Sequence, residues 1–496
     1  MQPSETFIAP GRKENPVVEL PAWRLSQEIH QKNLSCREVM EAYLDRIDAV
    51  NPQVNAIVAR QERNGLMEQA AAKDALLAGG ADEGWMHGFP QAIKDLENTK
   101  GIVTTAGYPG MAGFVPEADS LLVSRMKRLG SIVIGKTNTP EWGFGSQTYN
   151  EVYGTTGNPY NPALTPGGSS GGAACAVALG MQSVADGSDF MGSLRNPAGF
   201  CNVFGYRPSR GRIPSLGFEL FYLDCGVNGP MARTVPDLAL FVGSVSGPDI
   251  RVPASLEDDA DLKSLTPQNV VGRLQTEMKS KRVAWLGDLN GYLPMEDGVL
   301  ELCGEALKKL EDAGLDVEPV KPFFNPAEFW EEIWLPIRHL GSVFLKPFYD
   351  DPEKRALLKP ESVFEYEGSS KYGIRDLYRA GVLRSEMYAA MLRLFENYDV
   401  LAVPTAQVFP FDKRVHWPEE IAGRKMDTYH RWMEVVSHWT LMGVPVAAVP
   451  AGFDAKDRPM GIQLIGKPRG DWELLRFAYG YEQIHAEICG RRPELG

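Results

Sequence analysis

The chain has 496 residues, of which 44% are hydrophobic and 23% are charged, and its formal net charge is -13. This length is about three times that of a usual domain, yet one large α/β fold can hold it, and the composition excludes a disordered chain. Because the chain is acidic and has no basic tract, it would repel a phosphate backbone, which excludes nucleic acid as a main partner.

The expected location is the cytoplasm. Residues 1–16, MQPSETFIAPGRKENP, lack the apolar core of a signal peptide, and no later stretch approaches ~20 uninterrupted apolar residues. The scattered cysteines form no C-x-x-C pair, so we expect buried free thiols rather than zinc ligands or disulfides. These cysteines are Cys36, Cys175, Cys201, Cys225, Cys303 and Cys489.

Helices are predicted first along the chain. Residues 20–58 have the pattern of two amphipathic helices, the second capped by Ser35, with Glu38 three residues later, and ended by Asn51-Pro52. AAAKDALLAGG is a helix closed by glycine, and GFPQAIKDL is a buried strand that enters a polar turn.

Short strands and helices then alternate. Helix DSLLVSRMKRLG precedes strand SIVIGKT, and strand KRVAWLGDL precedes helix VLELCGEALKKLEDAG. This alternation predicts an α/β sheet covered on both faces. Residues 321–349 break the pattern with dense aromatics and prolines. We expect them close to a ligand site or, equally, packed in the core.

Residues 130–137, GSIVIGKT, satisfy the phosphate-loop pattern G-x-x-x-x-G-K-[ST]. A phosphate loop turns its backbone N–H groups inward and leads into a helix, whereas SIVI is a β-branched run typical of a paired strand. Pro140 and Gly143 disfavour a long helix directly afterwards. A strand is the favoured interpretation, and nucleotide binding is a minor alternative.

Residues 167–171, GGSSG, satisfy G-x-S-x-G, the nucleophile elbow of α/β-hydrolases. That elbow needs an apolar strand directly before it, but NPYNPALTP contains three prolines and cannot be a central strand. A serine esterase of this type is therefore a minor alternative. The histidines that it would need are interpreted as surface or hydrogen-bonded core residues: His339, His416, His430, His438 and His485.

Three stretches favour a different chemistry. Lys94 lies in a mostly apolar segment, where a lysine either snorkels to solvent or is held neutral for catalysis. Ser193 follows GSDFMG, a loop whose free N–H groups can form an anion-binding nest. Together with a serine of TPGGSSGGAACA, these residues would form a Ser-Ser-Lys hydrolytic constellation, which needs no histidine.

At these stretches the sequence resembles the amidase signature family, and the resemblance covers most of the chain. It implies a large mixed, twisted β-sheet with helices on both faces, and hydrolysis of non-peptide C–N bonds. IVIGKTNTPE is similar to a strand and turn of the family that has no nucleotide role. The matching segments, in the family's order, are GFPQAIKD, GKTNTPEWG, TPGGSSGGAACAVALG, GSDFMGSLRNPA, GPMARTVPDLA and GVPVAAVPAGFDAKDRPMGIQLIG.

The resemblance implies that Ser193 is the nucleophile, Lys94 the base and Ser169 the relay between them, held by a cis peptide bond that is rare without proline. Lys94 must be neutral to accept a proton, so burial or a nearby cation has to lower its pKa from about 10.4. Water would then hydrolyse the acyl-enzyme.

The resemblance also implies a site for the carbonyl oxygen. Ser170 would support the catalytic network, while Asp189 and Arg195 would hold the loop or form a purely structural ion pair. Many family members have two glycines where this chain has Met191-Gly192, which places a flexible apolar side chain near this site. The implied oxyanion donors are the backbone N–H groups of Phe190, Met191, Gly192 and Ser193.

Branches of the family differ in substrate. A glutamine-dependent amidotransferase subunit would need a partner and a polar pocket, and it remains the alternative. A fatty acid amide hydrolase usually carries an N-terminal membrane segment, which this sequence does not show. The aromatics of residues 323–349, with Trp417, Trp432 and Trp439, favour a stand-alone amidase for aryl or small hydrophobic amides, an aryl acylamidase, with urethanase or esterase side activity.

One amidase domain over residues 1–496 is expected. Its parts would be a helical region at 1–75, the signature core at 76–245, a more variable substrate-side region at 246–400 and the rest of the core at 401–496. No metal or cofactor is implied. The expected partners are a small amide or carbamate substrate and water, for a monomer or homodimer that binds neither nucleic acid nor membrane.

Overall fold

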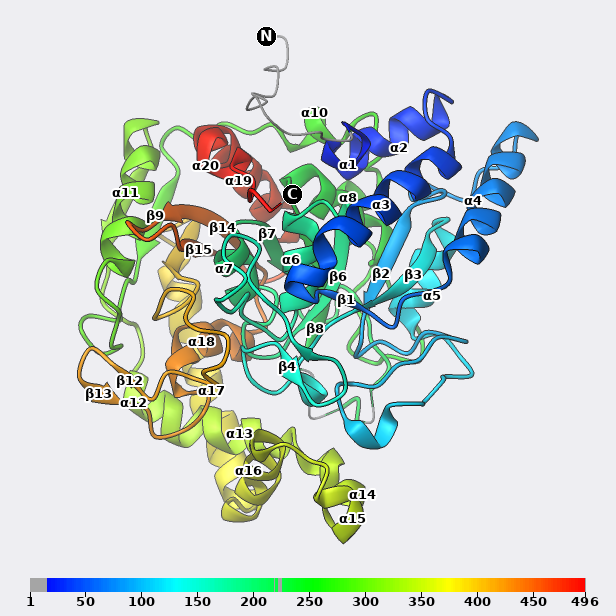
Figure 1. Ribbon diagram of the computed structural model, residues 1–496. Helices are drawn as coiled ribbons and strands as arrows, with labels where there is room; N and C mark the ends of the chain where they lie inside the picture. Colours follow the sequence, from blue (N-terminus) through cyan, green and yellow to red (C-terminus); the bar gives the residue numbers. More distant parts are fainter. Residues whose placement is uncertain (1–15, 218, 222–224, 496) are drawn as a thin grey trace.

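The structure, a computed structural model, describes residues 16–217, 219–221 and 225–495. A mixed sheet of eight strands crosses the middle of the molecule, and helices pack against its strands (Figure 1). This arrangement confirms the predicted α/β fold with a large mixed sheet covered by helices. Except for Pro16, the predicted polar leader lies outside the described residues.

The central sheet combines strands from distant parts of the chain. Its strands are β6 (Val184–Asp189), β7 (Phe204–Arg207), β8 (Val227–Ala232), β9 (Arg282–Trp285), β10 (Asp316–Pro319), β11 (Val400–Pro404), β14 (Val446–Phe453) and β15 (Pro459–Ile465). Their order is β10-β9-β11-β15-β14-β7-β8-β6. β9 pairs in parallel with β10 and β11, and the other neighbours are antiparallel. β6 therefore forms one edge of the sheet.

A second, three-stranded sheet carries Lys94. In it β3 (Ile132–Thr137) pairs antiparallel with β1 (Ile57–Val58) and parallel with β2 (Pro90–Lys94), and all three strands are buried. β2 and β3 confirm the strands predicted in GFPQAIKDL and SIVIGKT. The remaining strands form two short pairs, β4 (Tyr149–Asn150) with β5 (Gly154–Thr155) and β12 (Glu420–Ile421) with β13 (Arg424–Lys425).

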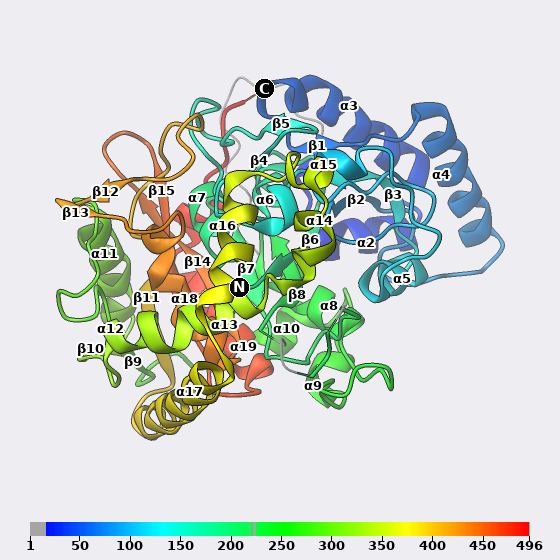
Figure 2. The same cartoon turned by 90° about the horizontal axis from the view of Figure 1, so that it is seen from below.

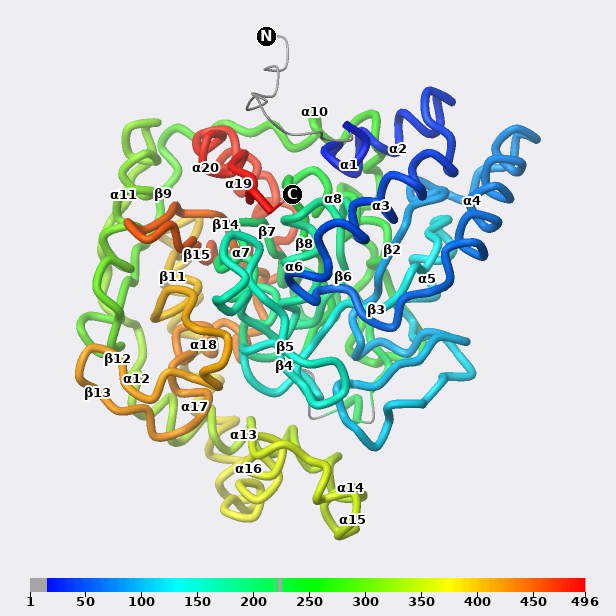
Figure 3. Tube along the Cα trace, viewed as in Figure 1, coloured from blue at the N-terminus to red at the C-terminus, as the bar shows by residue number. Residues whose placement is uncertain are grey.

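Helices fill much of the chain between the strands. Those of the described ranges are α1 (Pro16–Glu19), α2 (Ala22–His30), α3 (Cys36–Val54), α4 (Arg63–Ala78), α5 (Leu121–Arg128), α6 (Gly171–Ala178), α7 (Asn196–Cys201), α8 (Val235–Val245), α9 (Ala260–Lys263), α10 (Val270–Leu274), α11 (Val299–Asp312), α12 (Pro326–Glu328), α13 (Leu335–Leu340), α14 (Lys346–Tyr349), α15 (Pro352–Arg355), α16 (Pro360–Gly368), α17 (Ile374–Leu394), α18 (Glu434–Met442), α19 (Asp471–Ile484) and α20 (Ala486–Gly490). Of these, α6, α7, α8, α11, α19 and α20 contact the central sheet. Figure 3 shows α2 to α5, in blue to cyan, on one side of the molecule and α11, α17 and α18, in green to orange, on the other.

Helix α3 begins as predicted but ends later. Ser35 Oγ accepts the N–H of Glu38, and the Glu38 carboxylate accepts the N–H of Ser35, so the predicted capping box is confirmed. The prediction that Asn51-Pro52 ends the helix is wrong. Pro52 lies inside the last turn, a left-handed Asn55 closes the helix, and the buried Asn51 side chain bonds the backbone that follows.

Helices α13 to α16 lie together at one end of the molecule in Figure 1, and the view from below in Figure 2 shows α14 and α16 in front of the region of β6 and α6. α12, α13 and α14 belong to the aromatic segment 321–349, in which a π-helical turn at Phe329–Trp334 joins α12 to α13. Trp330 and Trp334 of this turn are fully buried, which confirms the core interpretation for these two rings.

Two further expectations concern the whole chain. Within the ranges that the structure describes, no helix is both long and apolar enough to cross a bilayer. The six cysteines are all buried, and none of them forms a disulfide within the described residues, as predicted. Burial raises the pKa of the Cys175 thiol, as it does for Cys201, which leaves these thiols protonated at neutral pH.

Gly205 of β7 is where the central sheet touches the loop that carries Ser193. A Cβ at this position would overlap the carbonyl oxygen of Leu194, the residue after Ser193. We expect Gly205→Ala to lower the free energy of unfolding by roughly 1–3 kcal/mol and to reduce activity, because overpacking displaces backbone. Gly304→Ala, in α11 with no atom within 4 Å of the new Cβ, should instead be neutral or stabilising by up to about 1 kcal/mol. Denaturant titration of both variants checks this, and equal stabilities would contradict it.

Candidate active site

The amine of Lys94 lies among three serine hydroxyl groups. Nζ is 2.8 Å from Oγ of both Ser169 and Ser170, and 3.0 Å from Oγ of Ser188. The side chain is fully buried, and burial lowers the pKa of Lys94 from 10.5 to about 7, against the opposing charges of Asp186 and others nearby. The lysine therefore does not snorkel, and a substantial fraction of it is neutral near pH 7.

Strand β6 supplies two of the groups around Lys94. Asp186 accepts the backbone N–H of Lys94 at 3.1 Å, and Ser188, two residues later, bonds its amine. Alternate residues of a strand face the same side, so this pair follows from the strand period. Ser188 was not predicted from the sequence, and the period of DGSD in a predicted strand would have been the signal. Burial raises the pKa of Asp186 to about 7.

The GGSSGG run places Ser169 and Ser170 at the start of α6. The peptide bond between Gly168 and Ser169 is cis, as the resemblance implies. The first turn of α6 packs directly on neighbouring backbone: a Cβ at Gly172 would overlap Asn138. The glycines thus allow the close approach that brings both serines to the lysine.

Ser193 lies in the loop after β6, and it lines the same pocket as Ser169 and Ser188. No hydrogen bond joins Ser193 to Ser169 within the described residues. Gly192, just before it, has a φ of +81° and packs against Val436, which leaves no room for a side chain. Of the two positions where many family members have glycine, only position 192 requires it here. Position 191 can therefore hold a methionine.

The predicted oxyanion donors are not equivalent. The N–H of Gly192 donates to the Asp189 carboxylate at 2.9 Å, which departs from its predicted role, because a buried carboxylate needs donors of its own. The N–H groups of Phe190, Met191 and Ser193 have no acceptor among the described residues. These three remain available to bind a carbonyl oxygen.

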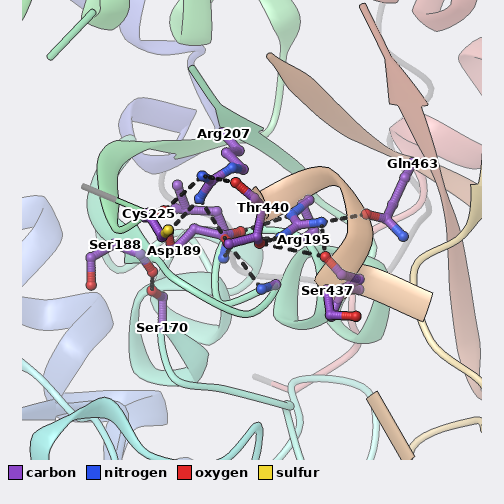
Figure 4. Close-up of polar contacts among 12 residues, drawn as sticks. Ser170, Ser188, Asp189, Arg195, Arg207, Cys225, Ser437, Thr440 and Gln463 are labelled. Atoms are coloured by element: carbon purple, nitrogen blue, oxygen red, sulfur yellow. Dashed lines mark hydrogen bonds and ion pairs between the residues drawn. The ribbon is translucent and has the colours of Figure 1, made fainter. Parts of the chain in front are cut away.

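Asp189 and Arg195 form a buried two-pronged ion pair (Figure 4). Arg195 Nε and Nη2 donate to the carboxylate at 2.9 and 2.8 Å, and Arg207, which was not predicted from the sequence, adds a bond at 3.2 Å. Burial alone would raise the pKa of Asp189, but the two guanidinium groups hold it well below its usual range. Because Arg195 also reaches Gln463 and Thr440, this network fixes the loop to α18 and β15. It does not touch the Lys94 amine, which favours the structural interpretation.

A pocket with a volume of about 150 Å³ is lined by Ser169, Ser188 and Ser193. Most of its wall is apolar, and only one charged side chain, Arg338, lies among its described lining residues. Of segment 321–349 only Arg338, Gly341 and Phe344 line it. The expectation that Trp417, Trp432 and Trp439 favour an aryl substrate is not supported, because none of the three lines the pocket, and Trp432 and Trp439 are buried. The apolar lining consists of Leu96, Trp142, Phe144, Phe190, Met191, Phe344 and Met433.

The two competing motifs do not form their sites. GSIVIGKT contains strand β3, and its Lys136 is buried with its amine bonded to the Glu97 carbonyl and to Thr99. No strand precedes the GGSSG run in residues 156–166, apart from an isolated bridge at Leu164. The favoured interpretation of both motifs is confirmed.

The prediction that the five histidines are surface or hydrogen-bonded core residues holds only in part. His339 and His485 are buried and bond backbone carbonyls, and His416 is exposed. His430 and His438, however, are buried, and both ring nitrogens of His430 and Nε2 of His438 have no partner in the described part of the chain. Burial lowers the pKa of each to about 3, so both are neutral rings packed among aromatic side chains.

Comparisons with known proteins agree with this geometry. A family profile described as Amidase matches residues 38–475. An acylamidase of Rhodococcus erythropolis is 33% identical over 469 residues, 94% of this chain and 95% of that protein. A glutamyl-tRNA(Gln) amidotransferase subunit from Moorella thermoacetica is 32% identical over 501 residues, 96% of this chain and 99% of that protein. A crystal structure of a bacterial aryl acylamidase of the amidase signature family has a TM-score of 0.86 at 26% identity, covering 97% of this chain and 100% of its own. This chain therefore belongs to the amidase signature family of hydrolases.

Proposed function

We propose that this protein is a stand-alone amidase that cleaves aryl or other small hydrophobic amides through an acyl-enzyme on Ser193. The observation that carries the proposal is the buried Lys94 amine, bonded to Ser169 at the wall of an apolar pocket that also contains Ser193. A lysine with a pKa of about 7 is able to act as a base at neutral pH.

In the proposed reaction, Ser193 Oγ attacks the amide carbonyl while its proton passes to Ser169, and the Ser169 proton passes to neutral Lys94. The N–H groups of Phe190, Met191 and Ser193 bind the developing oxyanion, and loss of one such donor costs roughly 3–4 kcal/mol in well-studied hydrolases. The proton returns through Ser169 to the leaving amine, and water then hydrolyses the acyl-enzyme by the same route.

Ser170 and Ser188 have a supporting role in this scheme. Both hydroxyl groups bond Lys94 Nζ, and the Ser170 hydroxyl also lies 3.4 Å from the Ser188 carbonyl oxygen. They hold the amine next to Ser169 in either protonation state, because a hydroxyl can donate or accept. Asp189 and Arg195 position the loop and take no proton.

The apolar wall supports an aryl or small hydrophobic substrate. Rings at Trp142, Phe144, Phe190 and Phe344 offer faces and edges to an aromatic group. An ester or a carbamate presents the same carbonyl to the same nucleophile, so esterase and urethanase activities belong to the proposal as side reactions.

The second candidate is a glutamine-dependent amidotransferase subunit. The similarity to the amidotransferase subunit from Moorella thermoacetica supports this candidate. Free glutamine carries an ammonium group that needs a carboxylate or several acceptors when it is buried. The described residues that line the pocket include no Asp or Glu. The lining therefore favours a substrate without an ammonium group.

Ser193→Ala and Lys94→Met should each reduce kcat/KM for an anilide by at least ~10³-fold, because nucleophile and base act as a unit. Methionine keeps most of the lysine volume without an amine. Ser146→Ala is the matched control: this serine lines the same pocket, its Oγ has no partner among the described residues, and activity should stay within roughly threefold. Retained turnover in Ser193→Ala or Lys94→Met would remove the assignment.

The kcat/KM for a neutral anilide should rise with pH through about 7 and then level off, because only neutral Lys94 accepts a proton. The negative charge of Asp186 raises the pKa of Lys94, so Asp186→Asn should move the midpoint to lower pH while its side-chain oxygen still accepts the Lys94 N–H. Steady-state rates between about pH 5 and pH 9 test both points. A flat profile, or a shift to higher pH in the variant, would contradict the role of Lys94 as the base.

A substrate panel separates the two candidates. The purified chain, without any second protein, should hydrolyse acetanilides, and phenyl carbamates and esters more weakly, but should not release ammonia from glutamine, because the pocket wall offers no partner for its ammonium group. Product formation by chromatography gives the answer, with Ser193→Ala as the blank. Glutaminase activity, or activity only with a co-purifying protein, would favour the amidotransferase.

A further inference from the structure

Arg338 of α13 is the one charged side chain among the described residues that line the active-site pocket. It is only 7% exposed, yet it shares the pocket wall with Ser169 and Ser193. The proposed chemistry uses Ser169 and Ser193 of this wall but gives Arg338 no role. A buried guanidinium at a substrate pocket therefore calls for an explanation of its own.

The guanidinium is held firmly along one edge. Its Nε donates to Glu365 Oε1 at 2.7 Å, and its Nη2 donates to the Tyr429 hydroxyl at 3.0 Å. The central carbon lies 5.0 and 5.1 Å from the ring centroids of Phe144 and Phe190, two pocket residues. Nη1 is left without an acceptor among the described residues. The geometry leaves this nitrogen as a fixed donor on the pocket side.

The charge of Arg338 is already balanced. Glu365 is fully buried, and although burial alone would raise its pKa, Arg338 and the neighbouring His339 hold that pKa well below the usual range, so the carboxylate is ionised. A carboxylate on the substrate would bring a second negative charge next to one buried cation, at a desolvation cost that the pair does not offset. An uncharged acceptor would satisfy Nη1 without that cost.

We propose that Arg338 Nη1 donates a hydrogen bond to an uncharged acceptor of the substrate, a ketone, ether, ester or nitro oxygen that lies beyond the scissile carbonyl, and thereby selects acceptor-bearing aryl amides over purely hydrocarbon ones. This inference rests on the proposed function, because it assigns a second contact to the same substrate in the same pocket. It narrows the substrate class from hydrophobic aryl amides to aryl amides with a polar but neutral substituent.

The test compares 4-acetylacetanilide with 4-isopropylacetanilide, and 4-acetylbenzanilide with 4-isopropylbenzanilide, so that the acceptor is placed on the amine side and then on the acyl side. In the Arg338→Met/Glu365→Gln variant, which removes the cation together with its counter-charge, the kcat/KM ratio of acetyl to isopropyl substrate should fall roughly tenfold or more in one of the two series. Comparing the ratio between wild type and variant cancels both the electronic effect of the substituent and any loss of folded enzyme.

Arg338→Lys is the second variant. Its single ammonium can keep the ion pair with Glu365 but cannot also reach the position of Nη1, so the same loss of preference is expected in a protein that keeps the buried pair. In addition, 4-carboxyacetanilide should be a worse substrate of the wild type than 4-acetylacetanilide. A preference unchanged in both series, or a wild-type preference for the carboxylate, would overturn the inference.

Binding measurements distinguish a failure of this inference from a failure of the proposed function. Calorimetric titration of the four neutral anilides into Ser193→Ala protein, with and without the Arg338 substitutions, reports the donor in the absence of turnover. Tighter binding of the acetyl compounds that depends on Arg338, without hydrolysis by the wild type, would contradict the proposed function alone. Hydrolysis by the wild type with no dependence on Arg338 would contradict this inference alone.

Discussion

The burial of the Lys94 amine is the constraint on which the rest of the site depends. An ammonium group in a fully buried position loses its hydrogen bonds to water. The hydrogen bonds to the three hydroxyl groups around Nζ compensate for only part of this loss in free energy. The pKa therefore falls until the neutral form is accessible near pH 7. Three segments surround the amine: β2 carries Lys94, β6 supplies Ser188 and Asp186, and the turn that leads into α6 supplies Ser169 and Ser170.

The loop that bears Ser193 obeys a different constraint. Its N–H groups must face the pocket while the rest of its polar atoms are satisfied inside the protein. Asp189 achieves this by accepting the N–H of Gly192 and of Leu194 and by pairing with Arg195 and Arg207. The ionised carboxylate thus turns two N–H groups inward, and those of its neighbours remain available. Fixed donors of this kind need no reorganisation as charge develops on the substrate.

Much of the fold could be predicted, as could the closeness of Lys94 to Ser169 and the position of Ser193 in the same pocket, because family motifs keep their order and strand and helix periods are local signals. What escaped prediction depends on contacts between distant segments: Arg207 reaches Asp189 from β7, which β8 separates from β6, and Arg338 belongs to helix α13 outside the sheet. The aromatic count was misleading for the same reason, since composition does not tell a core ring from a pocket ring. The four-part division of the chain, its cytoplasmic location and its oligomeric state remain predictions.

The pocket lies between two sets of segments that differ in how readily their residues can be substituted. On one side, Gly172 and Gly192 lie in the segments that carry Ser169 and Ser193 and pack against backbone or a neighbouring side chain with no space for a Cβ, so these two positions require glycine. On the other side, Arg338 of α13 and Phe344 of the short helical turn at Val343–Leu345 belong to the helical layer outside the sheet. During divergence of such a hydrolase, new substrates would be acquired by replacing the helical layer while the reactive wall is inherited intact.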